Sequence, residues 1–130
     1  MHVRNSVAVL ALSLALAVPL AAQGTSSEGA SQPAPALIAR GDSVYHGSGN
    51  CYACHGSKAE GLVGPSLTDA EWIHSKGTYE EIVAQINKGV PKEQSKSGIP
   101  MPPKGGAAIS DEDVKAVAAY VHSLAGKPGS

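Results

Sequence analysis

The segment Cys51-Tyr52-Ala53-Cys54-His55 contains both cysteines of this 130-residue chain, three positions apart and followed at once by a histidine. Residues three apart on a helical turn face the same side, so both thiols can point in one direction. Each thiol can then add to one vinyl group of a haem, and His55 is placed to reach the iron. The C-x-x-C-H spacing therefore predicts one covalently attached haem c, with its iron bound by His55.

Two other chemistries also use paired cysteines. A dithiol redox pair is expected in a thioredoxin-like βαβ setting, and a zinc site needs two more ligands at similar spacing. Neither pattern is present, because the chain has no third cysteine and its other histidines do not form a second ligand pair. These histidines are His2, His46, His74 and His122.

The N-terminus has the pattern of a secretory signal peptide. Arg4 precedes an almost uninterrupted apolar run over 7–22, and small residues follow it, so we expect a signal peptide over 1–24 with cleavage after Ala22 or Gly24. An uncleaved membrane anchor is the alternative, although the run is shorter than the ~20 apolar residues that a spanning helix needs. Covalent haem attachment in bacteria takes place outside the cytoplasmic membrane. We therefore expect a periplasmic or otherwise exported protein, tethered to the membrane only if this segment is retained.

The rest of the chain is organised as one small domain. Residues 25–35 (TSSEGASQPAP) are small, polar and proline-bearing, which predicts a flexible leader. Residues 36–126 are expected to fold as the domain, and 127–130 form a tail. The formal net charge of −1 gives no indication of nucleic-acid binding.

Apolar periodicity and capping signals predict three main helices and no strand, hence an all-α fold. The first covers 36–46. The second begins at Thr78-Tyr79-Glu80-Glu81, a capping box, and stops at Gly89. A third begins at Ser110, with Asp113 in the related capping position, and ends at Gly126. A shorter turn is expected around 69–75.

Large apolar side chains are scarce in this domain. The whole chain has five aromatic residues and no phenylalanine, so its own side chains can build only a modest core. A haem would supply a large flat apolar body for the helices to pack around, and its bonds to Cys51 and Cys54 would act as a staple. We therefore expect the cofactor to be part of the fold.

Four segments in this order resemble the class I c-type cytochromes, over most of 36–125. They are Gly41-Asp42-Ser43-Val44-Tyr45 before CYACH, Gly64-Pro65-Ser66-Leu67 after it, Ile99-Pro100-Met101-Pro102-Pro103, and Ala118-Ala119-Tyr120-Val121. The resemblance implies a small cytochrome c-like fold of three main helices and short turns around one haem. It implies that Gly41 allows close crossing of the first and last helices beside Tyr45 and Tyr120. It also implies that the Pro65 carbonyl accepts a hydrogen bond from His55.

Met101 is the candidate second axial ligand of the iron. It is the only methionine that remains once the signal peptide is removed, and its thioether is a soft ligand that favours ferrous iron. A methionine that fills a gap in the core is the alternative. The flanking prolines make a helical core position improbable and stiffen the loop. His122, on the last helix, is the nearest rival, and His46 and His74 are not expected to be ligands.

Two further features concern the rim of the site. Trp72 can donate its indole N–H to a haem propionate, as a tryptophan in this region does in similar proteins, or it can be an ordinary core residue. A group of lysines surrounds the approach to Met101 and can orient an acidic partner, or it can simply be a solvated face. These lysines are Lys88, Lys92, Lys96 and Lys104.

The leading functional hypothesis is transfer of single electrons between a redox protein donor and acceptor, with no nucleic acid and no small-molecule substrate. On this hypothesis the chain is not an enzyme. A peroxide-binding or gas-binding haem protein is expected instead if Met101 does not ligate the iron. A third possibility is a permanent haem module of a dehydrogenase or oxidase complex, which includes a membrane-bound partner.

Overall fold

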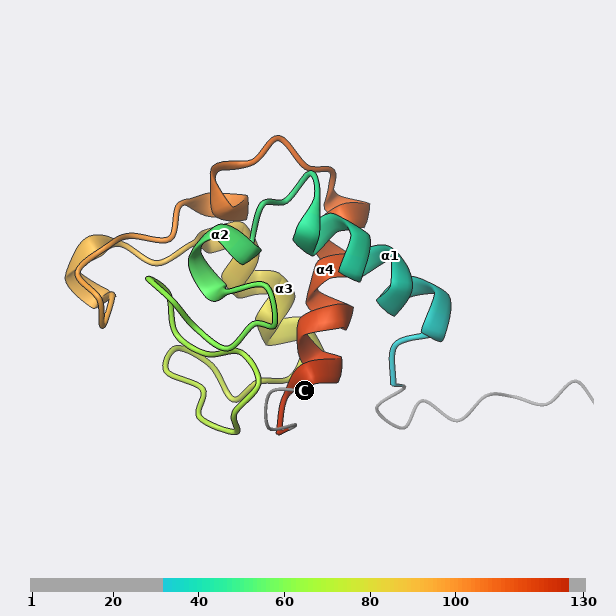
Figure 1. Ribbon diagram of the computed structural model, residues 1–130, viewed down its shortest axis with the longest axis horizontal. Helices are drawn as coiled ribbons and strands as arrows, with labels where there is room; N and C mark the ends of the chain where they lie inside the picture. Colours follow the sequence, from blue (N-terminus) through green and yellow to red (C-terminus); the bar gives the residue numbers. More distant parts are fainter. Residues whose placement is uncertain (1–31, 127–130) are drawn as a thin grey trace, which may run out of the picture. The chain divides into compact units, whose positions relative to one another are not determined.

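The computed structural model describes residues 32–126, which form helices joined by loops (Figure 1). The elements are α1 (Pro35–His46), α2 (Tyr52–His55), α3 (Tyr79–Lys88), η1 (Lys92–Gln94), η2 (Pro103–Gly106) and α4 (Asp111–Leu124). Within this range the only β-pairing is an isolated bridge between Val90 and Met101, so the all-α class is confirmed. No helix in this range is long and apolar enough to cross a membrane. The predicted signal peptide, residues 25–31 of the leader and the tail lie outside the described residues.

Both predicted capping boxes are present at the starts of α3 and α4. At α3, Thr78 Oγ1 accepts a hydrogen bond from the Glu81 N–H at 3.3 Å, and the Glu81 carboxylate accepts one from the Thr78 N–H at 3.4 Å. Ser110 and Asp113 make the same reciprocal pair at α4, at 3.1 and 3.3 Å. Each box satisfies N–H groups that have no acceptor within the helix, which is why both helices begin where the sequence predicts.

The crossing of α1 and α4 depends on Gly41, as the resemblance implies (Figure 1). Gly41 is buried, and a Cβ on it would collide with the Ala116 carbonyl group and lie 2.8 Å from Tyr120 Cβ. Beside the crossing, the ring centroids of Tyr45 and Tyr120 are 5.3 Å apart. A residue without a side chain therefore lets the two backbones meet, and an aromatic pair covers the contact.

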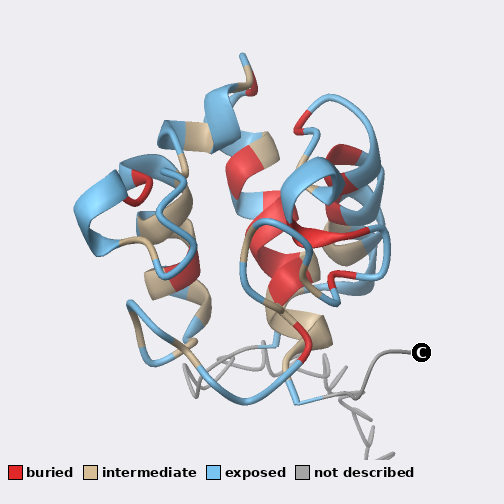
Figure 2. Ribbon diagram, turned by 60° about the vertical axis from the view of Figure 1, so that its left-hand side comes forward, coloured by how far each residue is buried: buried red, intermediate tan, exposed pale blue. Residues whose placement is uncertain are grey.

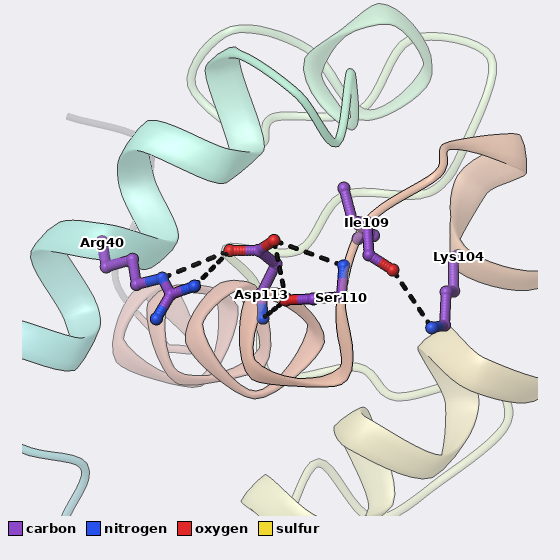
Figure 3. A network of polar contacts seen from close by, with 5 residues as sticks. All are labelled: Arg40, Lys104, Ile109, Ser110 and Asp113. Atoms are coloured by element: carbon purple, nitrogen blue, oxygen red, sulfur yellow. Dashed lines mark hydrogen bonds and ion pairs between the residues drawn. The ribbon is translucent and has the colours of Figure 1, made fainter.

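An ion pair that the sequence did not indicate joins the same two helices. Arg40 Nε and Nη2 both donate to Asp113 Oδ1, at 3.2 and 2.8 Å, across 73 positions of chain (Figure 3). The other oxygen of this carboxylate accepts the hydroxyl of Ser110 at 2.9 Å. These bonds from Ser110 and Arg40 hold the pKa of Asp113 below its usual range. One carboxylate thus caps α4 and orients it against α1.

The hydrophobic core is small and lies where α4 meets α1 and α3 (Figure 2). Its largest fully buried side chains are Tyr45, Val114 and Val117. One face of α4 is apolar and buried, with Leu124 partly buried at its end. Most of these side chains are alanine or valine, which confirms the modest core expected from the composition.

The segment around Trp72 forms bends rather than a helix. Asp69 Oδ1 accepts a hydrogen bond from the Glu71 N–H at 3.1 Å, and Ser75 Oγ accepts one from the Gly77 N–H at 3.2 Å. Short polar side chains that bond to the backbone two residues ahead compete with helical hydrogen bonds. The turn expected around 69–75 is therefore open and irregular.

Two side chains at the C-terminal end of α1 contact the backbone carbonyls of the two residues that follow the C-x-x-C-H segment. Tyr45 donates its hydroxyl to the Gly56 carbonyl at 2.8 Å, and His46 Nε2 lies 2.8 Å from the Ser57 carbonyl oxygen. On its other side, His46 Nδ1 lies 2.9 Å from the Asp42 carboxylate and 3.1 Å from the Asp42 carbonyl oxygen. Adjacent side chains of one helix therefore hold adjacent carbonyls behind His55.

This arrangement favours the protonated form of His46. Both ring nitrogens face acceptors, and a neutral imidazole can donate from only one of them. The pKa of His46 is accordingly raised, chiefly by the hydrogen bond to the Ser57 carbonyl. Because the pKa of His46 is higher in the folded protein than in the unfolded chain, the proton on His46 stabilises the fold. This stabilisation is complete below the unfolded pKa of about 6.5 and is lost as pH rises through the folded pKa.

We predict that the protein loses stability as the pH rises above about 6.5 by an amount that His46→Gln removes, because glutamine does not titrate in this range. The measurement is the denaturation midpoint at several pH values for both proteins, and the difference between them should shrink as pH rises. Parallel curves for the two proteins would show that His46 does not gain its proton more readily in the folded state.

Candidate haem site

A cleft opens beside α2 and receives residues from α1, α3, α4 and the loops between them. The space between its walls, including the open mouth, is about 1300 Å³. All six site residues proposed from the sequence line this one cleft, although they come from four separate parts of the chain. They are Cys51, Cys54, His55, Pro65, Trp72 and Met101.

The two cysteines lie at and within α2, on the helical turn that their spacing predicts. Asn50, just before them, has a φ of 50°, a left-handed conformation that asparagine adopts more readily than most residues. Both thiols are free, with Cys51 half-buried and Cys54 exposed. Burial raises the pKa of Cys51 to about 11, so this group is a protonated thiol at neutral pH. The pair thus offers two thiols to the same cleft.

His55 is held in one orientation at the end of α2. Its side chain is buried, and Nδ1 lies 2.9 Å from the Pro65 carbonyl oxygen, the hydrogen bond that the resemblance implies. A carbonyl oxygen can only accept, so Nδ1 carries the proton and Nε2 keeps its lone pair. Burial also lowers the pKa of His55, which favours this neutral form. An imidazole with a fixed tautomer and a free Nε2 is the state required of a metal ligand.

Gly64 leaves room for this ring. A Cβ at position 64 would lie 2.9 Å from His55 Cε1 and 3.0 Å from Nδ1, which is closer than side chains pack. The Gly64 N–H also donates to the Cys54 carbonyl oxygen at 2.9 Å. The loop after α2 is therefore folded tightly over the ring, and it brings the Pro65 carbonyl within hydrogen-bond distance.

Met101 is fixed through its backbone at the end of α3. It forms the isolated bridge with Val90, in which the Val90 N–H donates to the Met101 carbonyl at 2.7 Å and the Met101 N–H donates back at 2.9 Å. Gly89, with a φ of 71°, packs against the same segment, and a Cβ on it would strike the Met101 carbonyl and lie 2.8 Å from the Pro103 nitrogen. Sequence reasoning did not single out Gly89 or Val90 for this role.

The other described histidines occupy different places. His122 lies on α4 and does not line the cleft, and its Nδ1 is buried without a hydrogen-bond partner among the described residues. His46 is occupied at the end of α1. His74, however, lines the cleft and is exposed, so it stands nearer to the site than the sequence indicated. It is the control residue for any test of Met101.

Trp72 is partly buried in the wall of the cleft and packs against the hydrophobic core. Gly77, with a φ of 77°, lies directly against the indole ring, where a Cβ would collide with it. Trp72 thus packs against the core and also lines the cleft, an arrangement that fits both expected roles. A bond to a propionate stays a prediction.

The cleft walls carry large apolar side chains that the protein itself leaves exposed. Val63, Ile73 and Ile99 line the cleft with exposed fractions of 42, 36 and 52%. Apolar surface gathered around one cavity indicates a ligand-binding groove. Two thiols, an imidazole with a free Nε2, a thioether and these apolar walls fit a haem.

The lysines near Met101 are not equivalent. Lys88 and Lys92 are exposed, and Lys96 is exposed at the cleft. Lys104 instead is paired with the start of α4: its Nζ donates to Asp111 Oδ1 at 2.8 Å and to the Ile109 carbonyl at 3.1 Å. Lys104 therefore does not belong to the free rim charge expected from the sequence.

A family model and two similar proteins indicate the same protein family. The family model described as cytochrome C oxidase, cbb3-type, subunit III matches residues 36–121. The chain is similar to the cbb3-type cytochrome c oxidase subunit CcoP of Rubrivivax gelatinosus, with 42% identity over 105 residues, which is 75% of this chain and 31% of that protein. The subunit FixP of Bradyrhizobium diazoefficiens is 32% identical over 116 residues, 84% of this chain and 39% of that protein. The chain thus spans about a third of the length of these relatives.

A solved structure supports the fold. The crystal structure of cytochrome CL from the marine methylotrophic bacterium Methylophaga aminisulfidivorans superposes with a TM-score of 0.57, at 22% sequence identity, and covers 72% of this chain and 57% of that one. The helix order, the site geometry and these matches agree. The chain belongs to the family of cbb3-type cytochrome c oxidase subunit III, with the fold of a class I c-type cytochrome.

Proposed function

We propose that this chain is an exported monohaem c-type cytochrome that carries single electrons between redox proteins. The observation that carries the proposal is the meeting of Cys51, Cys54, His55 and Met101 in one apolar cleft. When bound there, haem iron would take up one electron from a donor and release it to an acceptor. No substrate would be chemically converted.

Each site residue has a separate task in this proposal. Cys51 and Cys54 would hold the haem through two thioether bonds, and His55 Nε2 and Met101 Sδ would be the axial ligands. The Pro65 carbonyl supports the basicity and orientation of His55 through the 2.9 Å bond to Nδ1. If His55 and Met101 both bind the iron, no ligand position would be left for oxygen or peroxide. This is the reason for preferring electron transfer to gas binding.

The relatives favour a second candidate, a permanent haem module of an oxidase complex. Both are named as subunits of cbb3-type cytochrome c oxidase, and this chain corresponds to about a third of each. The chemistry at the cleft is the same in either case, and only the permanence of the partner differs. Gentle extraction of membranes from the source organism distinguishes them: co-elution with oxidase activity supports the module, and elution alone supports the carrier.

The proposed route to the cofactor involves export. Residues 1–24 would direct the chain out of the cytoplasm, 25–35 would link it to the domain at 36–126, and 127–130 would form a tail. Mass spectrometry of the mature protein tests the first step. A new N-terminus after Ala22 or Gly24 is expected, and an intact Met1 would indicate a retained membrane tether.

We predict that expression with periplasmic haem-attachment machinery yields haem that stays with the denatured chain. Replacing both Cys51 and Cys54 with serine should abolish this covalent retention. Because the core is built largely of alanine and valine, the haem-free double variant should also be mostly unfolded. Circular dichroism through a thermal ramp is the measurement. A cooperative transition with near-native helix content in that variant would contradict a structural role for the cofactor.

We predict that Met101→Ala abolishes the weak charge-transfer absorption at the red end of the ferric spectrum and opens the iron to cyanide and carbon monoxide. His122→Ala and His74→Ala are the matched controls, and neither should do so. Rapid binding of carbon monoxide by the reduced wild type, or opening by a histidine variant instead, would show that Met101 is not the ligand.

We predict that the free lysines of the rim assist an acidic partner. Replacing Lys88, Lys92 and Lys96 with glutamine should lower the association rate and flatten its salt dependence, because rim charges act over about 8 Å at physiological ionic strength. Stopped-flow electron transfer to a natural acceptor at several salt concentrations is the measurement, with an unchanged haem spectrum as control. A wild-type rate at every salt concentration would make these lysines a solvated face.

A further inference from the structure

The segment that follows Met101 has a left-handed backbone, which is unfavourable for one of its residues, Lys104. Lys104, Gly105 and Gly106 have φ values of 55, 65 and 79°, so three successive residues are left-handed. Glycine accepts this region readily, but a lysine there is strained by its Cβ. Such strain persists only where surrounding contacts hold the residue in place.

The Lys104 side chain supplies those contacts. Its Nζ donates to the Ile109 carbonyl at 3.1 Å, as Figure 3 shows, and to Asp111 Oδ1 at 2.8 Å. Ile109 is buried, with 6% exposure, and Asp111 is the first residue of α4. The hydrogen bond and charge of Lys104 hold the pKa of Asp111 below its usual range. The Lys104 side chain is 29% exposed, whereas that of Asp111 is 75% exposed.

These contacts complete the attachment of the Met101 segment to the rest of the fold. On one side, Met101 is bridged to Val90 at the end of α3. On the other, Lys104 ties the turn three residues later to the start of α4. Between them the Gly105 N–H donates to the Pro102 carbonyl at 2.9 Å, which closes the turn itself. Without the Lys104 contacts, the segment would be held mainly by the Val90 bridge and by its packing against Gly89.

We propose that Lys104 is a positioning residue for Met101. Lys104 holds the methionine segment, residues 101–106, against the start of α4 and so limits how often Met101 leaves the iron. The proposal rests on the proposed function, since it requires Met101 to ligate. Lys104 acts on the ligand through the backbone and does not touch the cofactor. This role of Lys104 differs from the role proposed for the three free lysines of the rim.

The test uses imidazole, which enters the ferric site only when Met101 leaves the iron. Lys104→Gln should raise the imidazole association rate of the haem-loaded protein roughly three- to tenfold, because an attachment that opposes local opening is lost. Asp111→Asn should have a smaller effect of the same sign, since the bond to the Ile109 carbonyl remains. Lys104→Arg, which keeps the charge and the reach, should stay near the wild-type rate.

Two controls make the result specific. Lys115→Gln removes an equal charge that also acts on Asp111, but among the described residues the Lys115 side chain forms no hydrogen bond or ion pair with the methionine segment, and the imidazole rate of this variant should be unchanged. On a Met101→Ala background, Lys104→Gln should add nothing, because no methionine remains to be displaced. A Lys104→Gln effect that persists on that background would show general loosening and overturn the proposal.

The remaining outcomes separate this inference from the function beneath it. If Lys104→Gln binds imidazole at the wild-type rate while Met101→Ala binds it faster, Met101 is the ligand and Lys104 does not position it. If Met101→Ala itself binds imidazole no faster than the wild type, the proposed axial ligand is wrong, and the role of Lys104 falls with it.

Discussion

The hydrogen bond from His55 Nδ1 to the Pro65 carbonyl determines how the cleft can be used. It selects the tautomer, directs a lone pair on Nε2 away from the protein backbone, and depends on a loop that only a glycine at position 64 allows. Behind it, Tyr45 and His46 hold the carbonyls of the next two residues, so the end of α2 is supported from α1 as well. The orientation of the imidazole is thus supported both by the Pro65 carbonyl and, through the end of α2, by α1.

A second constraint is the shortage of large apolar side chains. The core is built mainly from alanine and valine, and three aliphatic side chains, those of Val63, Ile73 and Ile99, are exposed around the cleft. Burying that surface against an apolar ligand would contribute stability that the chain does not supply itself, at about 25 cal/mol per Å². Folding and cofactor binding are therefore coupled in this account. The Met101 segment lines the same cleft, and it is held by the bridge to Val90 just after α3 and by the Lys104 side chain at the start of α4.

Local signals in the sequence predicted most of the fold. The two capping boxes can be recognised in the sequence from residues three positions apart, Thr78 with Glu81 and Ser110 with Asp113. Helices α3 and α4 begin at these boxes. The contacts that were missed are those between distant residues. Arg40 and Asp113 are 73 positions apart, and nothing in either neighbourhood indicates their pairing. The pairing of Lys104 with the start of α4 was likewise not indicated, because a lysine beside glycines and prolines resembles a solvated surface residue until its contacts are known.

The central claim is that His55 and Met101 bind one haem iron in this cleft, and proton NMR of the ferrous protein tests it most directly. A methionine methyl group on low-spin ferrous haem iron lies above the porphyrin ring, and the ring current moves its signal far upfield of ordinary methyl signals. Met1 and Met101 are the only methionines in the chain, so a single upfield three-proton signal would identify Met101, particularly if Met101→Leu removes it. The account predicts that signal. A ferrous spectrum with paramagnetically shifted, high-spin resonances and no upfield methyl would contradict it.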